Sequence, residues 1–270
     1  RDAGDLLEWH LAQPGCVELQ HGLGRIADAR REGRGWRIGD NLLSHASSWW
    51  WQPDAQTHTR VQFELPAGWV VSAPWPTCAA ATDCRIVPAL PDDQPALVAL
   101  GPFALREMVA GPARIETAVL GTVEPQQLER LSGLGPRAVA LITQAHGLMP
   151  TPRLQIVVVP WPHATQPIAF GQIHRGGLGG MQLFVDPAAS VAALDADWVL
   201  PHELAHLLHP YLGDARGRWL AEGLASYYQN VLRARAGLLT PEAAWQRLFE
   251  GFERGRAAPG GDSLDAAASA

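Results

Sequence analysis

His202-Glu203-Leu-Ala-His206 is the stretch that decides how this chain of 270 residues is interpreted. Residues four apart project from one face of an α-helix, so His202 and His206 can bind one ion between their imidazoles. Glu203 points beside that ion, where it can take a proton from metal-bound water. Glu222, within Trp219-Leu-Ala-Glu-Gly-Leu-Ala-Ser-Tyr-Tyr228, is the expected third ligand. Three protein ligands and one open position are typical of a catalytic zinc site. The motif therefore predicts a zinc hydrolase with one zinc ion per chain.

The neighbouring residues favour a metal site over a chance motif. Polar groups in an apolar helix cost on the order of several kcal/mol to bury unless a metal satisfies them. We expect a metal helix from about 198 to 208, with Asp195 or Asp197 as its N-cap. The next helix, from about 219 to 236, should carry Glu222 in its first turn, after a tight link at residues 213–217. The apolar residues that surround the motif, as in a buried helix, are Trp198, Val199, Leu200, Leu204, Leu207 and Leu208.

Together the two motifs resemble the gluzincin metallopeptidases. The glycyl-aminopeptidase family is the most similar, and the similarity continues through Leu232-Arg-Ala-Arg-Ala-Gly-Leu-Leu-Thr-Pro-Glu242 and reaches residues 259–269. The larger zinc aminopeptidases of the same clan are more distantly similar. The resemblance implies that His202, His206 and Glu222 are the zinc ligands and Glu203 the general base. It also implies a peptide or protein substrate and a β-rich domain before the zinc domain.

Three departures from these relatives concern the substrate. The linker between the histidines and Glu222 is shorter than in the relatives. They carry a Gly-x-x-Glu motif whose Glu would anchor a substrate's amino terminus, whereas the matching stretch here, residues 176–185, contains no acidic residue. The larger aminopeptidases also place an oxyanion-binding Tyr far downstream, but no Tyr follows Tyr228. Cleavage from a chain end or within a chain both stay open. The candidate oxyanion or substrate contacts are Tyr227, Tyr228, His174 and His209, with Arg175 as a partner for a substrate carboxylate.

The expected mechanism follows from these parts. Zinc lowers the pKa of its bound water from about 15.7 toward about 7 and polarises the scissile carbonyl. Glu203 takes the proton of that water and passes it to the departing amine. Two other hypotheses remain: a gluzincin fold that binds zinc or peptide without turnover, and a metal-free module with a coincidental motif. Metal content distinguishes the metal-free module from the other two hypotheses. Turnover distinguishes the peptidase from a gluzincin fold that only binds.

Composition narrows the class of protein. A formal charge of −6 without basic clusters argues against a nucleic-acid partner, and no run of eighteen apolar residues predicts a membrane span. The chain begins with Arg, so we expect that an upstream segment has been removed. Cys78 and Cys84, six apart, suggest a short disulfide and a periplasmic or secreted protein, with Cys16 left over. The oligomeric state stays open.

The chain divides into a β-rich part and an α+β part. Short apolar or alternating runs predict an antiparallel β domain over residues 1–120. The order of elements over 121–255 is α+β and resembles the thermolysin-like catalytic subdomain that the gluzincin resemblance implies. The Ala, Gly and Ser content of residues 256–270 predicts a disordered tail. The tryptophans at 48–51 are interpreted as core, and His10, His21, His45 and His58 as surface or hydrogen-bonded residues. The second part should contain a helix over 125–146 that glycines split in two and Gly147 caps, a strand over 154–160, a loop over 161–180 and a strand over 181–186. If that last strand borders the cleft, a peptide could bind to it as an added strand.

Overall fold

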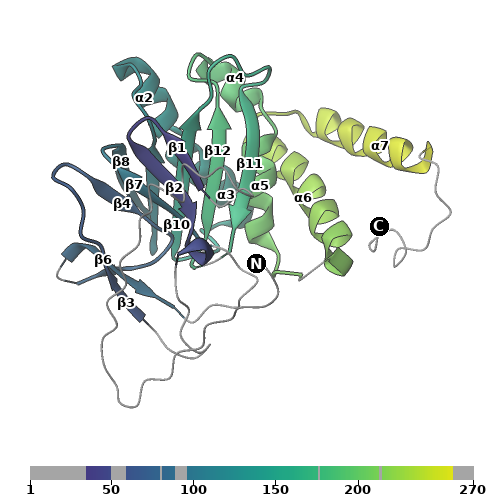
Figure 1. The fold of residues 1–270 in the computed structure, drawn as a ribbon. Coiled ribbons are helices and arrows are strands. Elements are labelled where there is room, and N and C mark those ends of the chain that lie inside the picture. Colours follow the sequence, from purple (N-terminus) through teal and green to yellow (C-terminus); the bar gives the residue numbers. More distant parts are fainter. Residues whose placement is uncertain are drawn as a thin grey trace.

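The computed structural model describes residues 35–49, 59–79, 81–88, 96–175, 177–212 and 215–257. Within them, strands of the N-terminal part lie on one side of a larger sheet, and helices lie on its other side (Figure 1). The α+β class predicted from the sequence is confirmed.

The N-terminal strands form two antiparallel sheets. One has the order β1-β2-β7-β4 and the other the order β3-β6-β5. The strands are short and separated by turns, as the frequent Gly and Pro residues predict. The bounds are β1 Gly35–Ile38, β2 Asn41–His45, η1 Ala46–Ser48, β3 Thr59–Gln62, β4 Val70–Ser72, β5 Thr77–Cys78, β6 Ala81–Val87 and β7 Leu97–Gly101.

The central sheet is mixed and has the order β11-β12-β10-β9-β8. Strand β10 pairs in parallel with β9 and β12, and the antiparallel strands β8 and β11 form the two edges. The domain boundary predicted at residue 120 therefore cuts through this sheet, because β8 and β9 precede that residue. The bounds are β8 Ala104–Ala110, β9 Ala113–Val119, β10 Arg153–Pro160, β11 Ile168–His174 and β12 Gly180–Val185.

The helices agree with the predicted pattern in their order. The helix predicted over 125–146 is split in two at Gly133, and Gly147 caps the second half with φ 88°. The apolar periodicity did not reveal α4 and α7, and α7 includes Arg256, which the prediction places in a disordered tail. Residues 258–270 lie outside the described residues. The bounds are α2 Pro125–Ser132, α3 Leu134–His146, α4 Val191–Ala196, α5 Val199–Ala205, η2 His206–Leu208, α6 Ala215–Arg235 and α7 Pro241–Ala257.

Both faces of the central sheet are buried, which explains why β10 is a continuous apolar run. One face packs against α2, α3 and α5, and α6 packs in turn on α3 and α5. The other face packs against the N-terminal strands. The core on the helix side includes Ile115, Leu154, Ile156, Met181, Leu183, Leu134, Ile142, Leu200, Leu204 and Leu232. The core on the strand side includes Leu43, Leu97, Ala99, Ala118, Leu120, Val157 and Val159.

A buried polar network joins the N-terminal strands to the central sheet. Arg153 Nη2 donates to Glu116 Oε2 at 2.6 Å, and Ser72 Oγ donates to the other carboxylate oxygen. Gln155 Nε2 in turn donates to Ser72 Oγ at 3.0 Å. Burial raises the pKa of Glu116, and the Arg153 guanidinium opposes that rise. The N-terminal strands are thus attached to the central sheet by hydrogen bonds as well as by apolar packing.

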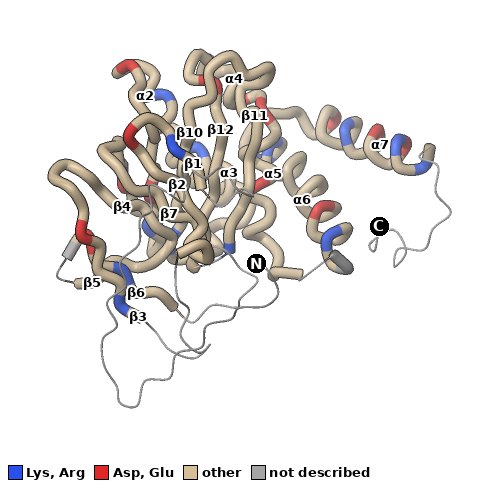
Figure 2. The backbone as a smooth tube through the Cα atoms, viewed as in Figure 1, with Lys and Arg blue, Asp and Glu red and all other residues tan. Residues whose placement is uncertain are grey.

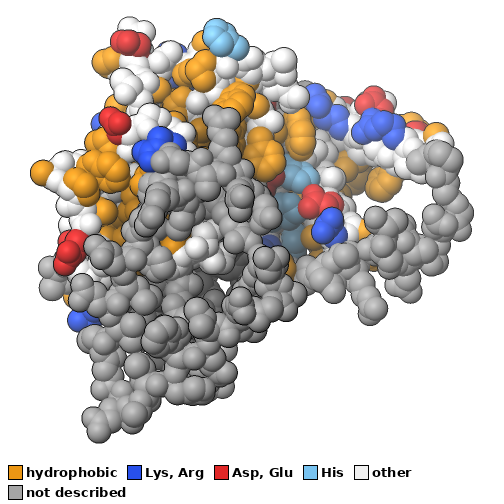
Figure 3. All heavy atoms as spheres, in the orientation of Figure 1, with side chains coloured by type: hydrophobic (Ala, Val, Ile, Leu, Met, Phe, Trp, Pro, Cys, Tyr) orange, Lys and Arg blue, Asp and Glu red, His pale blue; other side chains and the backbone are white. Residues whose placement is uncertain are grey.

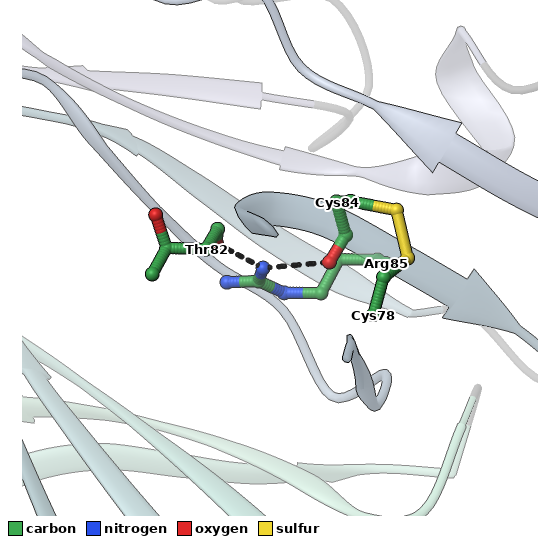
Figure 4. The surroundings of a disulfide bond; sticks show 4 residues. All are labelled: Cys78, Thr82, Cys84 and Arg85. Atoms are coloured by element: carbon green, nitrogen blue, oxygen red, sulfur yellow. Dashed lines mark hydrogen bonds between the residues drawn. A yellow bond between two sulfur atoms is a disulfide. The ribbon is translucent and has the colours of Figure 1, made fainter. Parts of the chain in front are cut away.

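Cys78 and Cys84 form a disulfide between β5 and β6, with a Cα–Cα distance of 5.4 Å (Figure 4). Beside it, the Arg85 guanidinium donates to the carbonyls of Thr82 and Cys84. Cys16 lies outside the described residues. The predicted bridge is therefore present.

Part of the tryptophan run can be placed. The Trp49 ring packs edge-on against Phe63 at 6.2 Å and borders a buried cluster, as the core interpretation predicts. Trp50 and Trp51 lie outside the described residues, as do His10, His21 and His58. Among the helices within the described ranges, none has the length and apolar character needed to cross a bilayer.

Candidate metal centre

Helix α5 carries the two histidines of the motif. Asp197 Oδ1 accepts the Val199 N–H at 2.7 Å, so Asp197 satisfies the first turn, although the position before the helix is Trp198. The last turn tightens into the short helix η2, which begins at His206. The rings of His202 and His206 still lie on one side, with centroids 5.2 Å apart. The predicted short metal helix is present.

Helix α6 carries Glu222, but in its third turn. The helix begins at Ala215, four residues before the predicted start, so the expected first-turn position was wrong. The prediction used Gly217 as part of a link, whereas this glycine is helical. A Cβ at Gly217 would collide with the Leu212 backbone, so a glycine allows the chain to turn back closely at this point. The close turn brings α6 against α5.

The three predicted ligands converge. One ligand atom from each of His202, His206 and Glu222 can be chosen so that all lie within 4.8 Å of one another. Glu222 Oε2 lies 3.2 Å from His202 Nε2 and 3.8 Å from His206 Nε2. The Glu222 side chain is 54% exposed, so the cluster opens to solvent on one side. Two imidazoles and one carboxylate around an open position match the donor set of catalytic zinc sites. The residues therefore fit a zinc ion.

A chain of hydrogen bonds fixes the protonation of His206. The Pro210 carbonyl can only accept, so His209 carries its proton on Nδ1, 2.9 Å from that oxygen. His209 Nε2 can then accept from His206 Nδ1 at 3.3 Å, which leaves the lone pair of His206 Nε2 free for a metal. Burial lowers the pKa of His206 to about 4, so the ring is neutral near pH 7.

Gln229 orients the His202 ring as His209 orients the His206 ring. Its Oε1 lies 2.9 Å from His202 Nδ1 and can accept that proton, so that Nε2 faces Glu222 with its lone pair. Gln229 lies two helical turns after Glu222 on α6. In thermolysin-like enzymes an Asp often stands four residues after the ligand glutamate, and Ser226 occupies that position here. The sequence offered no signal for Gln229, because its partner is 27 residues away.

Glu203 is held beside the ligands by strand β11. Its Oε2 accepts the Ile173 N–H at 2.9 Å. Burial raises the pKa of Glu203, the neighbouring Glu222 adds to that rise, and His202 and the Ile173 N–H oppose it. A raised pKa makes a carboxylate a better proton acceptor.

Strand β11 corrects the prediction for residues 161–180. The sequence predicted a loop there and a strand at 181–186, as a possible border of the cleft. β11 lies inside that loop and forms the sheet edge, whereas β12 is an interior strand between β11 and β10. The strand that lines the cleft includes Gly171-Gln-Ile-His174, and β11 contains no acidic residue.

Gly171 explains how β11 lies so close to the metal helix. A Cβ at this position would lie 2.6 Å from Val199 Cγ1 and 2.7 Å from Glu203 Cγ. A glycine within a strand often marks such a close approach. The strand was missed because this cause lies in the tertiary structure.

The three ligands line a cleft of about 430 Å³. In Figure 3, histidine side chains reach the surface there beside acidic and basic ones. Of the four residues predicted to contact the oxyanion or substrate, His174 and His209 are among the lining residues, and Tyr227 and Tyr228 are not. Two residues that the sequence did not single out, Tyr211 and Arg218, line the cleft. The lining residues are Phe170, Gly171, Gln172, Ile173, His174, Arg175, His202, Glu203, His206, His209, Tyr211, Leu212, Arg218, Ala221 and Glu222.

The His174 ring faces away from the ligands. It is 1% exposed and packs edge-on against His45 of β2, with ring centroids 5.3 Å apart. Neither of its ring nitrogens has a hydrogen-bond partner among the described residues. Burial lowers the pKa of His174 to about 3, and the nearby His45 contributes. His45 was expected to be at the surface or hydrogen-bonded, yet its Nδ1 is buried without a described partner.

Known proteins provide an independent comparison. Residues 201–270 match the family model described as M61 glycyl aminopeptidase. The resemblance to the gluzincin metallopeptidases is confirmed. The matched residues include both ligand motifs and the whole of α6. A search of curated proteins gives no match.

Solved structures extend the comparison to the N-terminal part. An aminopeptidase N family protein from Idiomarina loihiensis has 13% identity and a TM-score of 0.54, over 76% of this chain and 39% of that one. A mutant of a two-domain M1 zinc metallopeptidase bound to L-arginine has 16% identity and a TM-score of 0.50, over 88% and 55%. At these identities the likeness shows the fold alone. The chain spans less than two thirds of the length of either structure. The shared fold supports the predicted order of a β-rich part before an α+β part.

Proposed function

We propose that the chain is a zinc-dependent peptidase in which His202, His206 and Glu222 hold one zinc ion and Glu203 is the general base. The observation that carries this proposal is the convergence of the three ligand atoms within 4.8 Å, in a cleft that Glu203 also lines. Zinc suits this donor set, and a carboxylate that is not needed as a ligand suits proton transfer.

The chain's own residues provide the proton transfers. When bound, zinc supplies Lewis acidity, which polarises a carbonyl and makes a water easier to deprotonate. Glu203 accepts the proton of the attacking water and returns it to the amine that leaves. The Ile173 N–H holds one oxygen of this carboxylate, so the other oxygen is available for the proton.

The oxyanion contacts can be reassigned within this proposal. His209 uses both ring nitrogens, on His206 and on the Pro210 carbonyl, so we assign it to orienting the ligand. Tyr211 is the tyrosine among the lining residues of the cleft, and we assign it the donor role predicted for Tyr227 or Tyr228. His174 is assigned to the packing between the central sheet and the N-terminal strands, because its ring is buried against His45.

We also propose that the protein works in an oxidising compartment, the periplasm or the cell exterior. The disulfide between Cys78 and Cys84 supports this proposal, because structural disulfides persist mainly in such compartments.

The test combines metal content with hydrolysis of a mixed peptide library, with and without a chelator. Glu203→Gln should keep one zinc ion per chain and lose about 10²–10⁴-fold in rate, the usual contribution of general acid–base catalysis. His206→Ala should lose the metal together with the activity. Glu242→Gln, an exposed change in α7 outside the cleft, is the matched control.

The possible outcomes separate the hypotheses. Full activity of Glu203→Gln would overturn the mechanism. One zinc ion without cleavage of any peptide would identify a binding protein, and a chain that takes up no zinc would exclude the proposal altogether.

A further inference from the structure

The charged side chains of the cleft differ in whether they are free to bind a substrate. Arg175 and Arg218 bring positive charge, while Glu203 and Glu222 bring negative charge. Both carboxylates are already assigned, one to the metal and one to proton transfer. The two arginines balance the two glutamates, so a zinc ion makes the cleft net positive. A substrate group that is held by charge in this cleft should therefore be an anion.

Arg175 is a fixed charge that is tied to the protein. Its Nη2 donates to the His206 carbonyl and, at 3.1 Å, to the His209 carbonyl. The side chain is half-buried, and its guanidinium carbon lies 6.0 Å from the centre of the Tyr211 ring. Arg175 thus holds the end of the metal helix and adds positive potential, but its Nη2 group is engaged with the backbone.

Arg218 differs from Arg175 in its exposure and in its lack of hydrogen-bond partners among the described residues. It is exposed, lines the cleft and lies one helical turn before Glu222 on α6. In Figure 2, basic and acidic positions lie close together near the start of α6. Arg218 makes no hydrogen bond or ion pair with any residue that the structure describes. Other arginines are engaged, as Arg137 is with Asp195 at 2.7 Å and Arg153 with Glu116 at 2.6 Å. The guanidinium of Arg218 is free to bind a ligand.

We propose that the substrate carries a carboxylate close to the scissile bond and that Arg218 binds it. This inference rests on the proposed peptidase function and specifies its substrate class. A guanidinium presents paired N–H donors that match the two oxygens of a carboxylate. Among the described residues of the cleft, no further acidic side chain offers a counter-charge to a free amino terminus.

Helix geometry sets the position of that carboxylate on the peptide. Side chains four residues apart on a helix have Cβ atoms about 6 Å apart, so Arg218 begins about 6 Å from the Glu222 ligand. An extended peptide advances about 3.3 Å per residue. The carboxylate should therefore lie roughly one or two residues from the scissile bond. Either an acidic side chain or the free carboxyl terminus of a short peptide provides that chemistry.

The test compares matched peptides on the zinc-loaded protein. Each set differs at one position, with Glu, Gln or Lys, and each peptide is made with a free and with an amidated carboxyl terminus. We expect kcat/KM to be about tenfold higher for Glu than for Gln near the cleaved bond, and this preference should weaken as salt increases. If instead the free terminus is preferred over the amide, the same site reads the chain end.

The readout is the ratio of kcat/KM for the acidic peptide to kcat/KM for the neutral peptide. A variant that loses activity on both peptides alike leaves this ratio unchanged. In Arg218→Gln the ratio of acidic to neutral peptide should fall to about one, and in Arg218→Glu it should invert in favour of Lys. Arg254→Gln makes the same charge change on α7, outside the cleft, and should keep the wild-type ratio. An unchanged ratio in Arg218→Gln, or no preference in the wild type, would overturn the proposal.

A binding measurement keeps this inference distinct from the peptidase proposal. Glu203→Gln, loaded with zinc, should bind the Glu or carboxylate peptide about tenfold more tightly than its neutral partner. If neutral peptides are cleaved without discrimination, the substrate class fails and the peptidase stands. If nothing is cleaved but the anionic peptide binds selectively through Arg218, the catalytic proposal and the substrate class both fail, and only the binding of a carboxylate by Arg218 stands.

Discussion

Similar pairs of histidines lie on the two sides of strand β11, in different surroundings. On the helix side, the rings of His202 and His206 lie 5.2 Å apart, in the cleft that Gly171 and Ile173 also line. On the opposite side, the rings of His174 and His45 lie 5.3 Å apart, between the central sheet and the N-terminal strands. Ring spacing alone therefore does not identify a metal site.

The partners of the ring nitrogens distinguish the two pairs. Gln229 and His209 can accept the Nδ1 protons of His202 and His206, which turns both Nε2 lone pairs toward Glu222. For His174 both nitrogens, and for His45 the Nδ1, lack a partner among the described residues. The first pair is prepared to bind a cation, whereas burial favours the neutral form of the second.

Gly171→Ala should disturb the site on the helix side of β11 most strongly. The new Cβ would press on Val199 and Glu203, so β11 or the general base must move. We expect kcat/KM to fall about 10²-fold, as a misplacement of about 1 Å can cause, while zinc content is kept. Gly255→Ala is the control, because a Cβ there meets nothing within 4 Å. Wild-type kcat/KM in Gly171→Ala would show that the close approach does not position Glu203.

Gln229→Leu should make the helix-side pair resemble the other one. Without an acceptor, His202 loses the partner that orients its ring, and zinc affinity should fall about 10–100-fold. Competition with a coloured chelator measures this affinity. Gln229→Glu keeps an acceptor oxygen and should retain most of the affinity. Equal affinity in the Leu variant would remove Gln229 from the site.

His174→Asn sharpens the comparison from the other side. The pKa of His174 is lowered from 6.5 to about 3, so acid protonates the unfolded chain first. The stability that the neutral ring contributes is complete above pH 6.5 and is lost as pH falls toward 3, by about 2 kcal/mol at pH 5. Denaturant unfolding at pH 7.5 and at pH 5 gives the free energy of unfolding at each pH. Its decrease between the two pH values should be smaller in the variant than in the wild type by about that amount. His146→Asn, an exposed control, should lose as much as the wild type. An equal loss in all three proteins would contradict a buried neutral His174.

The local parts of the site could be predicted from the sequence. His202, Glu203 and His206 follow from helical spacing alone, and Glu222 follows from a second local motif. The start of α6 and the existence of β11 could not be predicted. Gly217 and Gly171 resemble loop residues in sequence, but each is a glycine because another part of the chain lies against it. Such causes are tertiary.

The same limit applies to the domain boundary and to the remaining cleft residues. The hairpin of β8 and β9 resembles the preceding β-rich part in composition, and its pairing with β10 alone places it in the central sheet. Arg218 had a usable signal, since it stands four residues before Glu222 on one helix face. Gln229 and Tyr211 had none of comparable strength.

The hydrogen bonds of β11 have a further consequence, for self-association. An edge strand exposes backbone N–H groups that can pair with the sheet of another molecule. In β11, the Ile173 N–H donates to Glu203 at 2.9 Å and the Ile168 N–H donates to Asp197 at 3.3 Å. Two carboxylates from the segment around α5 thus occupy amides along the strand that borders the cleft. The side chain that we propose as general base also protects this edge against aggregation.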